Sequence, residues 1–167
     1  MSVDQVERLL HRMATTLGTV LSARNVEQPA MIGVHTGGLW VAERLHAGLG
    51  LSQPLGRLDI TFYRDDFTRI GLHPQVKPSH IPFPVEDRHI LLVDDVLHTG
   101  RTVRAALNVI FDYGRPATVT LAVLVDRGGR ELPIQADVVG QSMRLARNEH
   151  VKLSGPAPLS LSVMSAP

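Results

Sequence analysis

The chain has 167 residues, no cysteine, 44% hydrophobic residues and a formal net charge of +1 at pH 7. This length and apolar content suffice for one ordinary globular domain, so we expect a single domain over residues 1–167. The composition excludes disulfides, thiolate metal sites and an overall basic surface. We expect a cytoplasmic protein, because the sequence shows neither a signal-peptide pattern nor an apolar segment long enough to span a bilayer.

Helix and strand patterns alternate along the first half of the chain. Apolar residues recur every three or four positions from Val3 to about Leu21, which predicts an amphipathic helix. The segment AMIGVHTGG predicts a short buried strand that ends at a glycine pair, and LWVAERLHAGL predicts a helix after it. RLDITFYRDD alternates like a strand. The proline-rich stretch at about 64–88 predicts an excursion from the sheet, either a flap or a hairpin.

The second half continues the same rhythm. HILLVDD is the clearest buried strand, GRTVRAALNVIFDYG the clearest helix, and ATVTLAVLVD and ADVVG predict two further strands. The tail VKLSGPAPLSLSVM has room for one more edge strand, because Gly155, Pro156 and Pro158 oppose anything longer. Alternating strands and helices predict the α/β class, with a central, mainly parallel, twisted sheet flanked by helices.

Two adjacent carboxylates and a phosphate-binding pattern meet at the end of the HILLVDD strand. Ligands of such sheets bind beyond the carboxyl ends of the strands, where Asp94 and Asp95 stand. The turn LHTG offers backbone N–H groups and a helix start, which favour phosphate, with Thr99 and Thr102 as further donors. Carboxylates repel phosphate but accept hydrogen bonds from vicinal sugar hydroxyls, so together the groups suit a ribose 5-phosphate with Mg²⁺ nearby. Taken singly, each feature also occurs without a ligand.

The segment ILLVDDVLHTGRT resembles the phosphoribosyl-pyrophosphate (PRPP) signature of the type I phosphoribosyltransferases. More narrowly, LDITFYRDD, VDDVLHTGRTVRAAL, DYGRPATVTLAVLVDRGGRELPI and ADVVG resemble, in this order, the PyrR family. The resemblance runs from about Met31 to Val139 and implies a type I phosphoribosyltransferase fold, with the flap at about 64–88 and a small hood built from terminal segments. It also implies a uracil phosphoribosyltransferase that makes UMP and pyrophosphate from uracil and PRPP, and that regulates pyrimidine genes through UMP-dependent binding to mRNA.

The resemblance assigns roles to residues at three places. Asp94 and Asp95 would bind the ribose hydroxyls, residues 98–102 the 5-phosphate, and the HTGG turn the pyrophosphate, unless that turn is a plain βα connection. Many relatives have Thr-Arg-Gly at the turn, and Arg64 could replace the missing guanidinium of this chain. The expected PRPP and UMP contacts are Thr36, Gly37, Gly38, Asp94, Asp95, Val96, Leu97, His98, Thr99, Gly100, Arg101 and Thr102.

Two segments are expected to read the uracil edge, largely through their backbone. They contain Val125, Asp126 and Arg127 in one case and Val138 in the other, although Asp126 and Asp137 can equally be solvated carboxylates at strand ends. His98 either assists deprotonation of uracil N1 or lines the pocket and contacts phosphate. The expected catalytic residues are Asp94, Asp95, His98 and Arg64.

Partners follow from the same resemblance. Mg²⁺ would arrive with PRPP rather than on a set of protein side chains, and the family forms dimers and larger rings. A surface for pyrimidine-gene leader mRNA would use local basic groups, which otherwise form an ordinary solvated surface: Arg8, His11, Arg12, Arg24, Arg144, Arg147, His150 and Lys152. A regulator that senses nucleotide with weak or no turnover is the alternative function, because the Thr36-Gly37-Gly38 turn lacks the basic residue.

Overall fold

The computed structural model describes residues 1–61 and 79–165. Its centre is a sheet of five parallel strands in the order β2-β1-β3-β4-β5. The strands are β1 (Ala30–Val34), β2 (Gly56–Leu58), β3 (His89–Leu97), β4 (Thr118–Asp126) and β5 (Val138–Ser142). Buried apolar runs, such as residues 90–93 of β3, suit a parallel sheet that is covered on both faces. The predicted α/β architecture is thereby confirmed.

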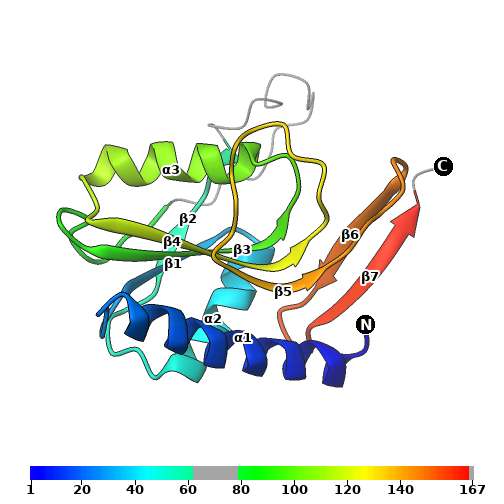
Figure 1. Cartoon of the computed structure of the whole chain (residues 1–167), viewed down its shortest axis with the longest axis horizontal. Coiled ribbons are helices and arrows are strands. Elements are labelled where there is room, and N and C mark those ends of the chain that lie inside the picture. Colours follow the sequence, from blue (N-terminus) through cyan, green and yellow to red (C-terminus); the bar gives the residue numbers. More distant parts are fainter. Residues whose placement is uncertain (62–78, 166–167) are drawn as a thin grey trace.

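Helices cover both faces of this sheet (Figure 1). The helices α1 (Val3–Ala23) and α2 (Gly37–Leu49) lie on one face, and α3 (Arg101–Tyr113) lies on the other. Side chains of β3 alternate accordingly, because Leu91 and Val93 join the core beneath α1 and α2 whereas Ile90 and Leu92 join the core beneath α3. The first predicted helix is confirmed with nearly the expected bounds.

The carboxyl-terminal segment forms more structure than the sequence suggested. Two antiparallel strands, β6 (Glu149–Ser154) and β7 (Ser160–Ser165), stand beside the main sheet, so the expectation of at most one strand was wrong. Gly155, Pro156 and Pro158 fill the connection between the strands instead of preventing them. The Met1 amine donates to the Leu161 carbonyl at 2.6 Å, which joins the two terminal segments as the predicted hood requires.

The segment after β2 departs from the expected strand. Within the described residues, only Arg57 and Leu58 of RLDITFYRDD belong to a strand, β2, and Arg64 lies outside the described residues, as do residues 64–78 of the expected flap. Residues 79–88 return onto the body of the protein, because His80 bridges to Arg57 and the side chains of Phe83 and Val85 are buried in the core. Among the described helices, none combines the length and apolarity needed to cross a membrane.

Candidate functional site

The strand order reverses between β1 and β3. From β1 the chain continues to β2 on one side, whereas β3, β4 and β5 follow on the other side. Because all five strands are parallel, the loops after β1, β3 and β4 leave from one common edge of the sheet. The loop after β1 leads to α2 on one face and the loop after β3 leads to α3 on the other face. A crevice between these loops is the usual ligand position in such sheets.

The acidic pair stands at this edge with fixed side-chain orientations. Asp94 is 4% exposed, and its Oδ1 accepts a hydrogen bond from the Asp95 N–H at 2.9 Å. Asp95 is partly exposed, and its Oδ1 accepts from the Val96 N–H at 3.0 Å. The two neighbouring carboxylates therefore differ in accessibility, and Asp95 is the one that faces solvent more openly.

The start of α2 packs directly against this pair. A Cβ atom on Gly37 would lie 2.1 Å from Oδ2 of Asp95, and one on Gly38 would lie 2.8 Å from the Val93 carbonyl and 2.9 Å from the Asp94 Cα. Both positions consequently need glycine for this close approach. The HTGG turn and the acidic pair, predicted as separate parts of one site, are in contact.

The N–H groups at the start of α3 can donate hydrogen bonds to an acceptor from outside the helix. Its N-cap residue is Gly100, with φ of 91°, which has no side chain to occupy the positive end of the helix. The Thr99 hydroxyl accepts from the Arg101 N–H at 3.3 Å. A helix start whose N-cap residue has no side chain is a suitable anion site.

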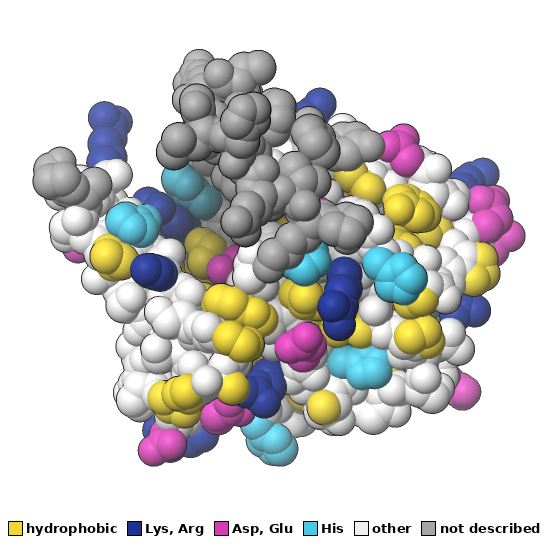
Figure 2. Space-filling view, turned by 180° about the vertical axis from the view of Figure 1, so that it is seen from behind, with side chains coloured by type: hydrophobic (Ala, Val, Ile, Leu, Met, Phe, Trp, Pro, Cys, Tyr) yellow, Lys and Arg dark blue, Asp and Glu magenta, His cyan; other side chains and the backbone are white. Residues whose placement is uncertain are grey.

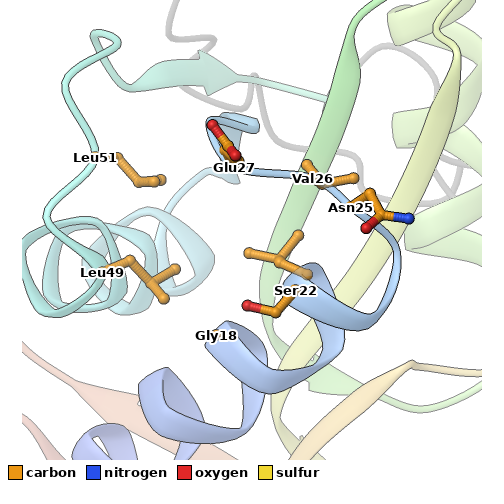
Figure 3. Close-up of a pocket in the computed structure, with 8 residues that line it drawn as sticks. Gly18, Ser22, Asn25, Val26, Glu27, Leu49 and Leu51 are labelled. Carbon is orange, nitrogen blue, oxygen red and sulfur yellow. The ribbon is translucent and has the colours of Figure 1, made fainter.

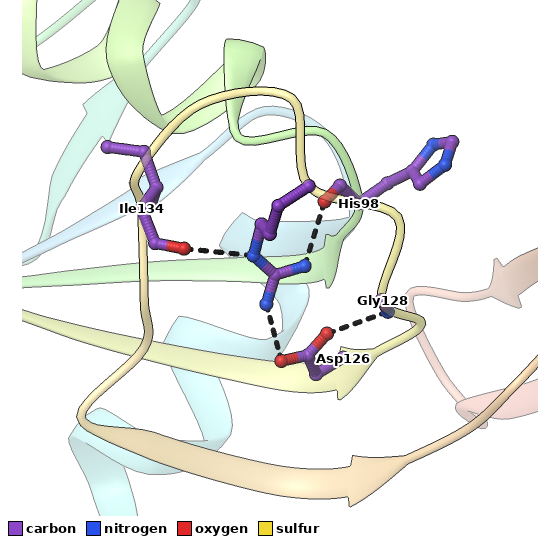
Figure 4. A network of polar contacts seen from close by, with 5 residues as sticks. His98, Asp126, Gly128 and Ile134 are labelled. Atoms are coloured by element: carbon purple, nitrogen blue, oxygen red, sulfur yellow. Dashed lines mark hydrogen bonds and ion pairs between the residues drawn. The ribbon is translucent and has the colours of Figure 1, made fainter.

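The loop between β4 and β5 lies along this helix start, and Arg130 holds it there (Figure 4). Arg130 donates to the His98 carbonyl at 2.8 Å, to the Ile134 carbonyl at 2.9 Å and to the Asp126 carboxylate at 2.5 Å. The other oxygen of Asp126 accepts from the Gly128 N–H at 2.9 Å. Sequence reasoning did not single out Arg130, although the segment DRGGR contains it.

Two titratable groups near this loop have shifted pKa values. Partial desolvation of the ring and the charges of Arg127 and Arg130 lower the pKa of His98, and Glu131 opposes them. Burial raises the pKa of Asp126, but hydrogen bonds from Arg130 and from the Gly128 N–H outweigh it, and the net pKa lies below the ordinary value. His98 is therefore mainly a neutral imidazole at pH 7, and Asp126 is a carboxylate.

Residues 2–153 match the phosphoribosyl transferase domain family. The bifunctional protein PyrR of Nitrosococcus oceani is 64% identical over 160 residues, which are 95% of this chain and 90% of that protein. The chain belongs to the PyrR family. The bifunctional protein PyrR of Pseudomonas paraeruginosa is 60% identical over 161 residues, 96% of this chain and 95% of that protein.

Solved structures agree on the fold of this PyrR-family chain. The hypoxanthine phosphoribosyltransferase of Trypanosoma cruzi superposes with a TM-score of 0.72 over 100% of this chain and 95% of that chain, at 17% identity. A hypoxanthine-guanine phosphoribosyltransferase from Bacillus anthracis gives a TM-score of 0.68 over 86% of this chain and 82% of that chain, also at 17% identity. The type I phosphoribosyltransferase fold implied by the sequence is confirmed.

The residues expected to contact uracil are placed unevenly. The Val125 side chain is fully buried in the core, and the Asp126 carboxylate is held by Arg130. The backbone N–H of Arg127 donates to the Leu97 carbonyl at 3.1 Å, which keeps this segment beside the end of β3. Val138 pairs with Ala122 at the beginning of β5, whereas Ser142 is the β5 residue that pairs with Asp126. The structure therefore does not bring Val138 to the carboxyl edge.

Basic residues expected to contact RNA fall into two groups. Arg8 and His11 are exposed on α1, whereas Arg12 donates to the Gly140 carbonyl at 3.0 Å. Arg24 is tied to the Asp137 carboxylate at 2.5 Å and to the Thr120 hydroxyl at 2.8 Å. The other group is exposed and belongs to the connection after β5 and to β6; its members are Arg144, Arg147, His150 and Lys152.

The surface is hollowed near the hairpin. On the face shown in Figure 2, a hollow separates the side that carries β6 and β7 from the rest of the molecule, and an acidic side chain is visible within it. A cavity of about 460 Å³ lies elsewhere, between the carboxyl-terminal ends of α1 and α2, where Gly18, Ser22, Val26, Leu49 and Leu51 are among its lining residues (Figure 3). Its lining includes no residue that the sequence assigned to the site.

Metal ligands were not expected from side chains alone. Within residues 1–61 and 79–165, no group of three or more His, Cys, Asp or Glu side chains is arranged to hold a metal ion. The oxygen atoms of the partly exposed Asp95 are nevertheless of the type that Mg²⁺ prefers. The donor set therefore fits a magnesium ion that takes most of its ligands from a phosphate-bearing substrate and from water.

Proposed function

We propose that this chain is a uracil phosphoribosyltransferase, which makes UMP and pyrophosphate from uracil and PRPP. One observation carries the proposal: in a PyrR-family chain, the Asp94-Asp95 pair contacts the Gly37-Gly38 turn and stands in the strand that leads, through a short turn, to the glycine-capped start of α3. A sugar with phosphate groups at both ends needs N–H donors for each phosphate and, between them, a hydrogen-bond acceptor for its hydroxyls. Two helix starts can supply the N–H donors. These three elements supply that arrangement.

The accessible carboxylate has the more direct role in the proposal. Asp95 accepts hydrogen bonds from the ribose 2′- and 3′-hydroxyls, while the deeply placed Asp94 contributes one edge of its carboxylate and orients the backbone of Asp95. The N–H groups and hydroxyls of residues 98–102 surround the 5-phosphate, and residues 36–38 receive the pyrophosphate. Arg64 remains a proposed partner of that pyrophosphate, although it lies outside the described residues.

The reaction exchanges one bond at ribose C1 for another. The bond between ribose C1 and the pyrophosphate oxygen breaks, and its electron pair stays with that oxygen. A bond forms between C1 and uracil N1, and N1 loses its proton. Residues 94–95 fix the sugar while positive charge develops at C1, and the N–H groups of residues 36–38 stabilise the departing charge. Mg²⁺ bound to PRPP supplies further charge neutralisation. The neutral His98 is a candidate acceptor for the N1 proton, or it lines the pocket.

The uracil ring belongs beside the loop that follows β4. Backbone groups of residues 125–127 lie next to the end of β3, and short backbone stretches can read the acceptor and donor pattern of a uracil edge. The side chain of Val125 takes no part, because it is buried in the core. The base subsite therefore uses main-chain atoms, and Arg127 is the candidate side chain of this segment for a contact with the base.

The family assignment also supports a regulatory role. We include in the proposal that UMP occupancy favours binding of pyrimidine-gene leader mRNA, and that the site of action is the cytoplasm, where PRPP, uracil and transcripts meet. The exposed basic groups on α1 and after β5 are the candidate phosphate contacts. Self-association would cover exposed apolar side chains, among which Phe111 is 56% and Val163 is 49% exposed.

A direct assay tests the catalytic proposal. The protein is incubated with labelled uracil, PRPP and Mg²⁺, and UMP is separated and counted. We expect UMP to form in proportion to enzyme and to disappear when PRPP is omitted. Binding of UMP without any turnover of uracil would contradict the proposal.

A further inference from the structure

Arg130 uses all three guanidinium nitrogens to join three separate parts of the chain. Nε donates to the Ile134 carbonyl at 2.9 Å, Nη1 to the His98 carbonyl at 2.8 Å and Nη2 to the Asp126 carboxylate at 2.5 Å (Figure 4). Asp126 ends β4, His98 stands in the loop after β3, and Ile134 lies further along the loop after β4. The side chain of Arg130 is only 25% exposed, and its bonds to Ile134 and Asp126 are partly buried, which limits competition from water there, whereas the bond to the His98 carbonyl is exposed.

Main-chain contacts lay the same two loops side by side. The Thr99 carbonyl accepts from the N–H groups of Glu131 and Leu132, at 2.9 and 3.1 Å. A Cβ atom on Gly100 would lie 3.0 Å from Ile134, so the start of α3 leaves no space between itself and this loop. The loop after β4 is therefore docked on residues 98–100 along much of its length, with Arg130 as the side chain that fixes the alignment.

We propose that Arg130 is a positioning residue that makes the phosphate-binding loop after β3 and the uracil-reading loop after β4 move as one unit. The inference rests on the proposed function, in which one loop holds the 5-phosphate of the nucleotide and the other holds its base. A nucleotide has a fixed distance between these two ends, so a site that binds both tightly needs the two loops at a fixed separation. Arg130 sets that separation without touching the reacting atoms.

The geometry requires arginine and not merely a positive charge. A planar guanidinium can direct bonds to three acceptors at once, whereas a lysine ammonium on a flexible stem cannot reproduce this fork. Arg130→Lys therefore keeps the charge beside Asp126 and His98 but loses the alignment. Arg130→Met loses both. The pair of variants separates an electrostatic role from a positioning role.

The experiment compares these two variants with wild type and with Arg44→Gln. Arg44 is a matched control because its side chain is also in an ion pair, with Glu7 at 3.8 Å, away from the two loops. Melting temperatures are measured first, so that all assays run well below unfolding. Hydrogen exchange of the 97–102 amides, the dissociation constant of UMP and the steady-state constants for PRPP and uracil are then measured.

We expect Arg130→Lys and Arg130→Met to speed exchange of the 97–102 amides and to weaken UMP binding about tenfold or more. KM for PRPP should rise more than kcat falls. We expect Arg44→Gln to match wild type. Wild-type behaviour of Arg130→Lys with impairment of Arg130→Met alone would overturn the inference, as would unchanged exchange in both. If wild type makes no UMP, the proposed function fails, and exchange and UMP binding still decide the positioning role.

Discussion

At the scale of single residues, Asp94 and Asp95 show how adjacent carboxylates acquire different roles. Successive side chains of a strand point to opposite faces, so a pair at a strand end cannot be equivalent. Asp94 is buried and bonded to the next peptide, whereas Asp95 is partly exposed against the start of α2. The sequence predicted the pair, but only the packing of Gly37 and Gly38 shows which carboxylate is accessible.

Asp95→Asn tests the sugar contact with little change of shape. A hydrogen bond to a charged acceptor contributes about 1.5–3 kcal/mol, so the loss of charge should lower kcat/KM for PRPP roughly 10- to 100-fold. Because Asp95 is partly exposed, the melting temperature should change little. Steady-state kinetics with varied PRPP check this expectation, and unaltered kcat/KM in a folded variant would refute the role of Asp95.

His98 gives a prediction for the pH dependence. Desolvation, Arg127 and Arg130 lower its pKa and Glu131 raises it, so Glu131→Gln should lower the pKa of His98 further. If the neutral imidazole takes the uracil proton, kcat/KM for uracil falls below that pKa, and the acid limb of the profile moves to lower pH in the variant. NMR titration of the His98 ring should show the same direction. An acid limb that stays in place while the ring pKa moves would assign His98 to lining the pocket.

The Asp126–Arg130 pair gives a prediction for stability. The pKa of Asp126 lies below its ordinary value of 3.8, so the folded state favours the carboxylate. This stabilisation is present above about pH 4, and it is lost as pH falls through the lowered pKa. Arg130→Met should therefore reduce the free energy of unfolding by about 1–2 kcal/mol at pH 7 and by less near pH 3. Thermal melts at both pH values measure the difference, and an equal difference at both would show that Asp126 is not involved.

At the scale of elements, the sequence predicted local structure better than long-range pairing. The strand, turn and helix from His89 to Tyr113 are continuous in sequence, so both elements and the turn between them could be predicted. The contact between Arg130 and His98 joins residues 32 positions apart, and no local pattern indicates it. The place of Val138 at the beginning of β5 could not be predicted, because the register of β5 against β4, and not the segment itself, decides which residue reaches the carboxyl edge.

Substitutions of the two glycines at the start of α2 should affect folding and activity differently. A Cβ on Gly37 meets the end of the Asp95 side chain, which can turn away, whereas a Cβ on Gly38 meets the backbone of Val93 and Asp94. We expect Gly37→Ala to fold normally but to displace the Asp95 carboxylate and lose activity. Gly38→Ala should lower the free energy of unfolding by about 1–3 kcal/mol.

Gly18→Ala in α1 is the control for these substitutions. The nearest atom to its added Cβ lies 4.0 Å away, so the change should stabilise the helix by about 0.5–1 kcal/mol and leave activity unaltered. Chemical denaturation and the UMP assay test all three variants. Full activity of a well-folded Gly37→Ala variant would show that the Asp95 orientation seen here is not needed for turnover.

At the scale of the whole molecule, the net charge is only +1, so any RNA contact must use a local basic group. If α1 contacts RNA phosphate, Arg8→Gln should weaken the salt dependence of leader-RNA binding in the presence of UMP. The slope of the logarithm of the binding constant against the logarithm of salt concentration should fall in magnitude by about one unit. Arg115→Gln, an exposed change beyond the end of α3, serves as control. An unchanged slope for Arg8→Gln would move the RNA surface to the group after β5.

The fold of the whole molecule was largely predictable because buried parallel strands are apolar throughout and helices are amphipathic. The hairpin of β6 and β7 was not, since its strands carry mostly exposed side chains and depend on contact with the first residue of the chain. This hood bounds the hollow on the face shown in Figure 2. The hollow between this added element and the rest of the molecule is visible only in three dimensions.

The most direct test of the central claim is to map, by NMR, which backbone amides change chemical shift when UMP is added. The claim is that the nucleotide lies where β3 passes into α3. We expect the largest shifts at residues 94–102, smaller ones at residues 125–131, and none around Gly18 and Val26 in the cavity between α1 and α2. Shifts concentrated at that cavity, or their absence from residues 94–102 at saturating UMP, would contradict this placement of the nucleotide.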